Sequence, residues 1–381
     1  MPPLLLHVFP SFETGGAQMR TVTLMNALED RFRHSVIALN GDLSCAERIH
    51  SGVAWTSRPA PASRHPAAAA WRFRAVLREV RPSLLLTYNW GAIDALLALL
   101  PGRLCPAVHV EDGFGPDEAA GLKARRVWTR RLVLPRVTRW LVAPSRTLCR
   151  IAVERYRLPE GHIRHIPNGV DVARFRPHRR PDLRRVLGIP EQAVVFGAVA
   201  RLRPEKDLAY LVARFAEARL PEACLLIAGG GPGERELREA VRARGLADQV
   251  VFAGDVRDAA PYYGVMDVFA MSSITEQMPI GLLEAMSSGL PALCTDVGDT
   301  RHLLPTAHRQ LAVPREQPEL YTAALRRLAG DPAWRAALGA ENRARACAEF
   351  SMERMVERWE RLYREAAGIS LLPEQQHEHI P

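Results

Sequence analysis

The sequence has little cysteine and no closely spaced cysteine pair. Six cysteines are spread over 381 residues without a C-x-x-C string. This excludes the usual spacing of a zinc site and the dense pattern of a disulfide-stabilised domain. We therefore expect free thiols and a cytoplasmic, reducing environment. Glycine and proline, at 26 and 29 residues, are too few for a collagen-like or low-complexity chain, so a globular fold is expected.

Long hydrophobic runs are also missing. The most apolar window, residues 84–100, contains Asn89 and Asp94, and a charge at a bilayer centre costs about 2.5 to 3.5 kcal/mol on insertion scales. No membrane-spanning helix is therefore expected. Residues 1–10 have no basic segment before their apolar stretch and lead into Gly15 and Gly16 instead of a cleavage site. We interpret them as a first strand and not as a signal peptide.

Carboxylates are absent from residues 119–153, which contain nine Lys and Arg side chains. Residues 1–170 have 23 basic and 13 acidic side chains, and residues 171–381 have 28 and 29, so the net charge of +9 belongs to the first half. The stretch is either a solvated helix face or a surface for an anionic partner. Its cations alternate with apolar residues over a helix limited by Pro135 to about residues 121–134, which suits an anionic membrane surface. No nucleic-acid motif accompanies it, so nucleic acid is not an expected partner. The expected membrane-facing residues are Lys123, Arg125, Arg126, Arg130 and Arg131.

The chain is longer than one hydrophobic core usually serves, which is about 250 to 300 residues, so two domains are expected. Short runs of Val, Ile and Leu alternate with longer helical patterns, which is typical of β-α-β units and predicts an α/β fold with parallel sheets. A segment rich in Pro and Arg, residues 172–190, separates two such series. We place the domains at 1–171 and 172–350, followed by a helix and a frayed tail at 351–381. The predicted strands are 4–9, 34–39, 83–87, 107–110, 140–143 and 164–166, then 193–199, 223–228, 250–253, 267–271 and 291–294.

Two glycine clusters follow predicted strands. Gly15 and Gly16 precede a predicted helix at 17–28, where free backbone amides and the helix dipole favour an anion such as a diphosphate. The second cluster, residues 229–233, is followed by Glu234 where the dinucleotide fingerprint would need glycine. No G-x-x-x-x-G-K-[ST] string occurs either. A dinucleotide-dependent dehydrogenase and a P-loop nucleotidase are therefore disfavoured.

Charged residues of two loops complete the pattern. Arg201 and Lys206 follow the strand at 193–199, at the end where open α/β sheets bind ligands, and could clamp a diphosphate. Glu276 and Glu284 are eight residues apart, the first on a predicted loop and the second on a predicted helix after Pro279. Both could therefore contact different parts of one long ligand. After Pro314 the period is helical, with Leu320, Ala324 and Leu328 on one face.

Taken together, these motifs resemble those of the retaining GT-B glycosyltransferases, most closely glycosyltransferase family four. Glu276 to Glu284 resembles its E-x7-E signature, and Arg201 with Lys206 its R-x4-K pair. The match extends over nearly the whole chain and implies two Rossmann-like domains that face each other across a cleft, with a C-terminal helix that crosses back to the first domain. The other matching segments are Gly15-Gly16, Asn168-Gly169-Val170-Asp171, Gly229-Gly230-Gly231-Pro232 and Phe252-Ala253-Gly254.

The resemblance also implies roles for individual residues. Arg201 and Lys206, with the Gly15 and Gly16 amides, would hold the diphosphate of a nucleotide-sugar donor. Glu284 would bind the ribose hydroxyls and Glu276 would orient the donor sugar. His109 resembles the family's active-site histidine, so the implied catalytic set is Glu276, His109, Arg201 and Lys206. Further donor-binding residues would be Gly231, Gln277, Met278 and Pro279, and weaker acceptor contacts would come from Glu111 and Asp112.

The expected reaction is transfer of a hexose-type sugar from a UDP- or GDP-sugar to a hydroxyl group with retention of anomeric configuration. The leaving phosphate can act as the base, so no dedicated catalytic carboxylate pair is required, and neither a metal nor another cofactor is expected. The basic stretch favours a lipid-linked glycan acceptor and a peripheral position on the inner face of the membrane. Gln277-Met278 and Gly298-Asp299 depart from the family's usual residues and leave the sugar open. The alternatives are a non-catalytic GT-B partner that binds nucleotide in a polysaccharide assembly complex, and a nucleotide-sugar epimerase of the same fold.

Overall fold

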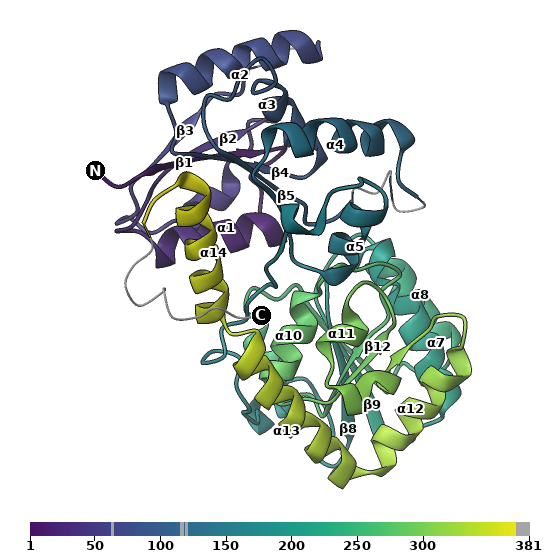
Figure 1. Cartoon of the computed structure of the whole chain (residues 1–381). Helices are drawn as coiled ribbons and strands as arrows, with labels where there is room; N and C mark the ends of the chain where they lie inside the picture. Colours follow the sequence, from purple (N-terminus) through teal and green to yellow (C-terminus); the bar gives the residue numbers. More distant parts are fainter. Residues whose placement is uncertain (62–64, 115–117, 119–120, 371–381) are drawn as a thin grey trace. The chain divides into compact units, whose positions relative to one another are not determined.

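The computed structural model describes residues 1–61, 65–114, 118 and 121–370 (Figure 1). The chain divides into two compact units. The N-terminal unit comprises Met1–Pro167 and the segment from Met355 onward, and the C-terminal unit comprises Asn168–Arg354. Residues 371–381, where a frayed tail is predicted, lie outside the described residues, as do Ala119 and Ala120 of the acid-free stretch. Each unit has its own parallel sheet, which confirms the predicted α/β fold with two Rossmann-like units.

The N-terminal unit is built on a seven-stranded parallel sheet with the order β3-β2-β1-β4-β5-β6-β7. Its central strands are buried except for the first residue of β1, as unbroken apolar runs predict for a sheet covered on both faces. Six strands were predicted, and β3 was missed because this edge strand has only exposed or half-buried residues. The strands are β1 (Leu4–Phe9), β2 (Arg33–Ala38), β3 (Trp55–Arg58), β4 (Leu84–Tyr88), β5 (Ala107–Val110), β6 (Trp140–Ala143) and β7 (Ile163–His165).

Helices cover both faces of this sheet. Apolar side chains of α2 to α5 join those of the strands in one core, while α1 and α14 lie on the other side (Figure 1). The last helix, α14, is tied to the N-terminal unit by an ion pair between Arg31 and Glu360 and by an edge-on contact of Phe32 with Tyr363. The helices are α1 (Gly16–Ala27), α2 (Pro66–Val80), α3 (Ile93–Leu97), α4 (Ala124–Val137), α5 (Arg146–Glu154) and α14 (Met352–Ala367), with 3-10 turns at Ser44–Arg48, Trp90–Ala92 and Glu160–His162.

Helix α4 runs through Pro135, so the prediction that this proline limits the helix to about residue 134 was wrong. A proline inside a helix removes one backbone hydrogen bond to the residue four positions earlier. Here the lost bond is the one to the Arg131 carbonyl, and side chains add bonds to other carbonyls near the end of the helix. The Thr138 hydroxyl donates to the Leu134 carbonyl at 2.7 Å, and Arg136 donates to the Leu132 carbonyl at 2.5 Å.

The C-terminal unit has a six-stranded parallel sheet with the order β10-β9-β8-β11-β12-β13. Helix α7 packs on α8 and on α12, and α10 packs on α13 and α9. The strands are β8 (Val194–Val199), β9 (Ala223–Ala228), β10 (Val250–Gly254), β11 (Val268–Met271), β12 (Ala292–Thr295) and β13 (Ala312–Val313). The helices are α6 (Pro181–Val186), α7 (Leu208–Ala218), α8 (Glu234–Ala243), α9 (Ala260–Tyr263), α10 (Ile280–Ser287), α11 (Thr300–Leu303), α12 (Pro318–Gly330) and α13 (Pro332–Glu349), with 3-10 turns at Pro204–Lys206 and Thr306–Leu311.

The buried face of α12 differs from the predicted one. Tyr321, Leu325 and Leu328 are fully buried, whereas Leu320 is 48% exposed. Both faces contain apolar residues at helical spacing, and packing against α7 and β12 selects the one with the larger side chains. The predicted helical period is confirmed, and of the three residues on the indicated face only Leu328 is fully buried.

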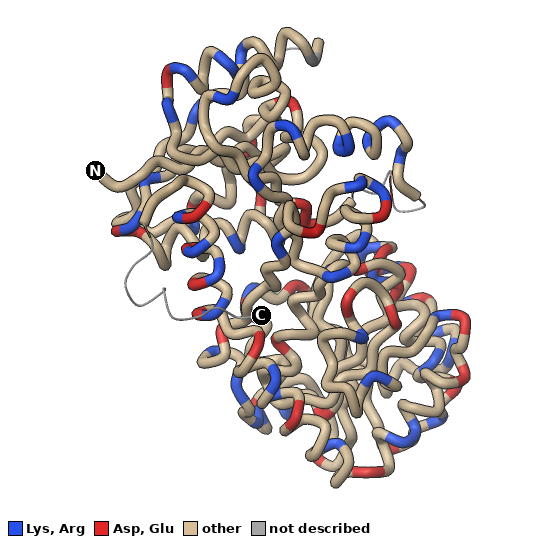
Figure 2. The backbone as a smooth tube through the Cα atoms, viewed as in Figure 1, with Lys and Arg blue, Asp and Glu red and all other residues tan. Residues whose placement is uncertain are grey.

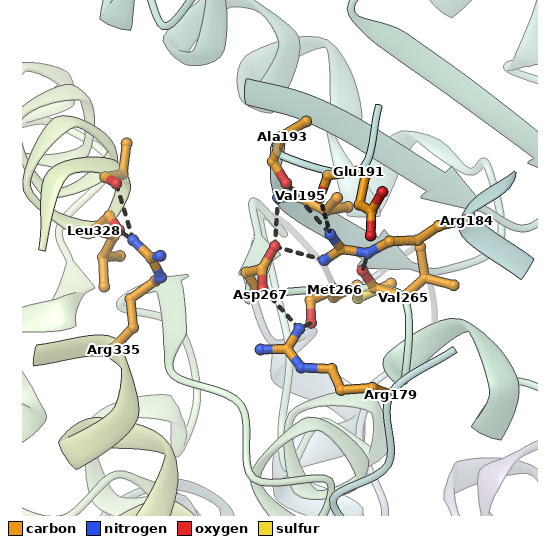
Figure 3. A network of polar contacts seen from close by, with 11 residues as sticks. Arg179, Arg184, Glu191, Ala193, Val195, Val265, Met266, Asp267, Leu328 and Arg335 are labelled. Carbon is orange, nitrogen blue, oxygen red and sulfur yellow. Dashed lines mark hydrogen bonds and ion pairs between the residues drawn. The ribbon is translucent and has the colours of Figure 1, made fainter. Parts of the chain in front are cut away.

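A carboxylate holds the amino ends of β8 and β11 together (Figure 3). Asp267 accepts hydrogen bonds from the Val195 amide at 2.9 Å and from Arg184 and Arg179 at 2.7 Å each. Burial alone would raise the pKa of Asp267, but the amide and the two arginines outweigh it and lower this pKa. The segment before β8 is thus fastened to the sheet on the edge opposite to the carboxyl ends of the strands.

The cysteines and the helices were each the subject of a prediction from the sequence. All six cysteines are free thiols, as predicted. Within the described part of the chain, no helix combines the length and the hydropathy that crossing a bilayer requires.

Candidate active site

Strand order reverses at one place in each sheet. In the N-terminal unit this place lies between β1 and β4, and in the C-terminal unit between β8 and β11. Doubly wound sheets bind ligands at the carboxyl ends of the strands beside such a reversal. Arg201 and Lys206 follow β8, and Glu276 follows β11. The topology therefore brings the predicted cationic loop and the predicted glutamate loop together.

Lys206 and Glu276 form an ion pair. The Lys206 Nζ lies 2.5 Å from Glu276 Oε1, and the Ser273 hydroxyl donates to the same oxygen at 2.8 Å. The two charged side chains are 28% and 13% exposed. A carboxylate held by an ammonium group and a hydroxyl has a defined orientation and can still be reached by a ligand.

The glycine-rich loop supports the loop that bears Arg201. Gly231 lies so close to Leu202 that a Cβ atom on Gly231 would be 2.7 Å from the Leu202 carbonyl oxygen and 2.8 Å from its nitrogen. Leu202 donates to the Gly230 carbonyl, and Gly233 donates to the Leu202 carbonyl, both at 3.0 Å. Arg201 itself is exposed. Gly231 thus has a structural reason to be glycine, separate from the donor contact that the sequence predicts for it.

A glycine in the left-handed conformation packs against the loop that bears Glu276. Gly298 has φ +55°, and a Cβ atom there would lie 2.1 Å from the Glu276 carbonyl oxygen. The following residue, Asp299, donates its amide to the Gln277 carbonyl at 3.0 Å. Two further residues were predicted to bind the donor. Met278 is buried, and its sulfur atom accepts a hydrogen bond from the Asn168 amide. Pro279 directly precedes α10. The departure at Gly298-Asp299 therefore retains the glycine that the loop needs.

Glu284 lies on α10 and is hydrogen bonded to a tyrosine. The Tyr263 hydroxyl donates to Glu284 Oε2 at 2.8 Å. Burial raises the pKa of Glu284 to about 7, although Tyr263 and Arg174 act in the opposite direction; Asp258 adds to the rise. The carboxyl group therefore changes charge near neutral pH. Nothing in the sequence pattern indicated Tyr263 as its partner.

In the N-terminal unit, the predicted residues at the end of β5 are buried and paired. His109 is fully buried, with Nδ1 2.8 Å from the Thr87 hydroxyl. Glu111 forms a two-pronged pair with Arg130 at 2.7 and 2.8 Å. Burial would raise the pKa of Glu111, but Arg130 and the His109 ring outweigh it and lower this pKa to about 2. The donor-sugar role of His109 and the acceptor role of Glu111 stay predictions, and both side chains have partners in this structure.

Asp112 and the first glycine loop lie beside the reversal in the N-terminal sheet. Asp112 accepts hydrogen bonds from Arg20 of α1 at 2.5 and 2.9 Å, and its amide donates to Asn89 at 2.8 Å. Gly15 is the residue before α1, which begins at Gly16 as predicted within one residue. The first amides of α1 therefore lie at a position suited to an anion.

The basic stretch is only partly a surface. Arg125 and Arg131 are exposed on α4, as are Trp128 and Leu132 at 56% and 51%. Arg126 is half-buried and donates to Glu118 at 2.8 Å, and Lys123 is exposed. Arg130 is fully buried against Glu111, so it does not belong to the membrane-facing set in which the sequence placed it. The helical spacing alone could not show that one of these cations points into the unit.

Comparison with known proteins shows the family of this chain. The family Glycosyltransferase Family 4 matches residues 14–174, and the family Glycosyl transferases group 1 matches residues 179–345. The structure of Anabaena Alr3699/HepE in complex with UDP superposes with a TM-score of 0.80 at 19% identity, and the match covers 96% of this chain and 100% of that one. The α/β fold with two Rossmann-like units, together with the two matched families, assigns the chain to the GT-B class. The chain belongs to these glycosyltransferase families and is a glycosyltransferase.

Two curated relatives are similar over part of their length. The UDP-Gal:alpha-D-GlcNAc-diphosphoundecaprenol alpha-1,3-galactosyltransferase of Escherichia coli is 28% identical over 236 residues, which are 56% of this chain and 57% of that protein. The GDP-mannose-dependent monoacylated alpha-(1-6)-phosphatidylinositol monomannoside mannosyltransferase of Corynebacterium glutamicum is 33% identical over 208 residues, 51% and 54% of the two chains. The matched segments thus span little more than half of each relative.

Proposed function

We propose that the chain transfers a hexose-type sugar from a UDP- or GDP-sugar to a hydroxyl group with retention of anomeric configuration. The observation that carries this proposal is the Lys206–Glu276 pair at the reversal between β8 and β11, with Glu284 on the helix that follows. The names of the two curated relatives, with UDP-Gal and GDP-mannose as donors, support the donor class. Glucosyl, galactosyl and mannosyl donors all remain within this proposal.

The residues divide the chemistry among them. Arg201 and Lys206 bind the diphosphate and stabilise its growing charge as the bond from the anomeric carbon to the phosphate oxygen breaks. Glu276 orients the sugar, and Glu284 accepts hydrogen bonds from the ribose hydroxyls. The acceptor oxygen forms its new bond on the same face, and its proton passes to the leaving diphosphate. In this proposal the route uses neither a metal nor another cofactor.

We further propose a lipid-linked glycan acceptor at the inner face of the membrane. The names of both curated relatives include a lipid in the acceptor, diphosphoundecaprenol in one and phosphatidylinositol in the other. A face of the N-terminal unit that combines exposed apolar residues with exposed cations supports this proposal; we call it the basic apolar face. Blue positions follow α2 and α4 in Figure 2. We define the face by its exposed apolar residues Trp71, Leu100, Leu104, Trp128 and Leu132 and its exposed cations Arg103, Arg125, Arg131 and Arg136.

Hydrogen bonds join the parts of this face. Arg74 of α2 donates to the carbonyls of Ala98 and Gly102 at 2.8 Å each, and Arg103 donates to the Arg136 carbonyl of α4 at 2.8 Å. The loop after α3 therefore connects α2 with α4. Aromatic and aliphatic side chains among arginines are suited to the headgroup region of an anionic bilayer.

The test measures donor binding and turnover separately. Binding of UDP- and GDP-sugars is screened by thermal shift, because a ligand of the native state raises its apparent stability. Release of nucleoside diphosphate and transfer to lipid-linked acceptors are then assayed, and the anomeric configuration of the product is read by NMR. Glu276→Gln should abolish transfer and leave nucleotide binding largely intact, whereas the exposed Glu239→Gln on α8 should change neither. Binding without any turnover in the wild type would instead indicate a non-catalytic partner protein, and conversion of the donor without an acceptor would indicate an epimerase.

A further inference from the structure

An arginine outside the predicted site joins the two loops that bear Lys206 and Glu276. Arg315 follows β13. Its Nη1 donates to the Ser272 carbonyl at 2.7 Å, and its Nη2 lies 2.5 Å from Asp207 Oδ2. The guanidinium also lies over the Tyr210 ring, with 4.7 Å to the ring centroid. One rigid planar group therefore spans the loop after β8 and the loop after β11.

Asp207, which pairs with Arg315, has a backbone conformation that is unfavourable for a residue with a side chain. Asp207 directly follows Lys206 and has φ +39° and ψ +54°, in the left-handed region that residues with a side chain seldom occupy. Its carboxylate also accepts a hydrogen bond from the Tyr210 amide at 3.2 Å and so caps α7. Such a conformation persists only where its surroundings hold it. The Arg315 ion pair is one of the interactions that hold it.

Direct bonds between the loops run alongside the arginine. The Ser272 hydroxyl donates to the Lys206 carbonyl at 3.0 Å, and the Ile274 amide donates to the Glu205 carbonyl at 2.8 Å. Ser272 is buried, whereas Arg315 and Asp207 are about one quarter exposed. The loop that bears Lys206 and the loop that bears Glu276 are therefore joined by two direct hydrogen bonds and by the bridge through Arg315.

We propose that Arg315 is a positioning residue for the Lys206–Glu276 pair, which it aligns by fixing Asp207 in the left-handed conformation and by holding the Ser272 carbonyl. The inference rests on the proposed transfer reaction, because it concerns the geometry of the same site. Arg315 touches neither Glu276 nor the Lys206 ammonium group in the contacts above. Its effect must therefore pass through the two loops.

The experiment compares Arg315→Ala with Arg326→Ala. Arg326 donates to the Glu217 and Ala218 carbonyls at the other end of α7, so it supports the same helix away from the two loops. We expect Arg315→Ala to lower kcat/KM by about 10- to 100-fold, since small displacements of reacting groups have effects of that size. Arg315→Lys should be intermediate, because an ammonium group cannot bond both loops in the same geometry. Arg326→Ala should keep kcat/KM within about threefold of wild type.

A second variant separates positioning from general stabilisation. In Arg315→Ala with Asp207→Gly, the glycine adopts the left-handed conformation without steric strain and leaves no unpaired carboxylate, although the cap on α7 is lost. We expect this double variant to recover part of the kcat/KM that Arg315→Ala loses, but not all of it, because the bond to the Ser272 carbonyl is still missing. Equal losses in Arg315→Ala and Arg326→Ala, or no recovery in the double variant, would overturn the inference while the proposed function stands. A wild type without turnover for any donor overturns the proposed function itself, and the positioning role with it.

Discussion

The Tyr263 hydroxyl group lies 2.8 Å from Glu284 Oε2 and 3.2 Å from the Gly281 carbonyl oxygen. The phenol has one proton for two acceptors on the same turn of α10. Its ring is fully buried, in edge-on contact with Phe175 and tilted against Phe269. Tyr263 is therefore a fixed donor beside a carboxyl group whose pKa burial raises to about 7.

Donor binding should increase as the pH rises through about 7. If the ribose hydroxyls donate to Glu284, the ionised form binds them better, and this form gains population above its pKa. Tyr263→Phe removes a bond that favours the ionised form, so the midpoint should move to higher pH and the affinity at pH 7 should fall by about tenfold. Calorimetric titration of the nucleoside diphosphate between pH 5.5 and 8.5 measures both effects. Tyr262→Phe is the matched control, and an unchanged midpoint in Tyr263→Phe would contradict the role of the hydroxyl.

Gly231→Ala should weaken donor binding through the Arg201 loop. The added Cβ would overlap the backbone of Leu202, and relief of such overlap usually costs about 1 to 3 kcal/mol. We expect lower thermal stability together with a loss of donor affinity of at least about tenfold. Gly245→Ala provides the control, because Gly245 has φ +67° but open space around it. It should lose about 1 kcal/mol of stability and keep the wild-type donor affinity.

Separating the buried Glu111–Arg130 pair should destabilise the N-terminal unit. Replacing one partner leaves an unpaired buried charge, which costs about 3 to 5 kcal/mol. Glu111→Leu and Arg130→Met should each show this loss in chemical denaturation, and the double variant should recover much of it. The pKa of Glu111 is lowered to about 2 in the folded chain. Its stabilisation is therefore complete above about pH 4.3, the ordinary value, and disappears as the pH falls toward 2. If the double variant loses as much stability as the two single variants together, the two charges are not coupled.

Binding to anionic vesicles should depend on the exposed cations of α4 and not on Arg130. Each cation near an anionic surface contributes about 1 kcal/mol, so Arg125→Glu with Arg131→Glu should weaken binding at least about 30-fold. Co-sedimentation with phosphatidylcholine vesicles, with and without phosphatidylglycerol, is measured at low and high salt. Arg185→Glu with Arg242→Glu applies the same charge change to exposed positions of the C-terminal unit. Equal sedimentation with both vesicle types would refute the membrane proposal.

Local patterns predicted most of the strands and the loops of the site. Unbroken apolar runs such as Leu84 to Leu86 correspond to buried parallel strands, and chemistry-bearing residues after such strands gather at one edge of the sheet because the strands are parallel. The edge strands β3 and β13 lacked this signal, since one is largely exposed and the other has two residues. The approach of Lys206 to Glu276 followed from the topology.

Side-chain partners distant in the chain could not be predicted. Arg130 and Glu111 are 19 positions apart, and Arg315 and Asp207 are 108 positions apart. Charge counting treats all these arginines as equivalent, whereas burial makes Arg130 structural and leaves Arg131 exposed. Which helical face is buried also depends on what packs against it, as Leu320 and Tyr321 show.

Helix α14 has a consequence for how the chain folds during its synthesis. The N-terminal unit is made first, yet one face of its sheet is covered by residues from Met355 onward. Until Glu360 and Tyr363 leave the ribosome, Arg31 lacks its carboxylate and Phe32 lacks its aromatic neighbour. The C-terminal unit, Asn168–Arg354, is contiguous and can close before that moment. The first unit to be translated is therefore the last to be completed, and a nascent chain halted before Met355 lacks the part of this cover that α14 provides, which exposes apolar side chains to chaperones.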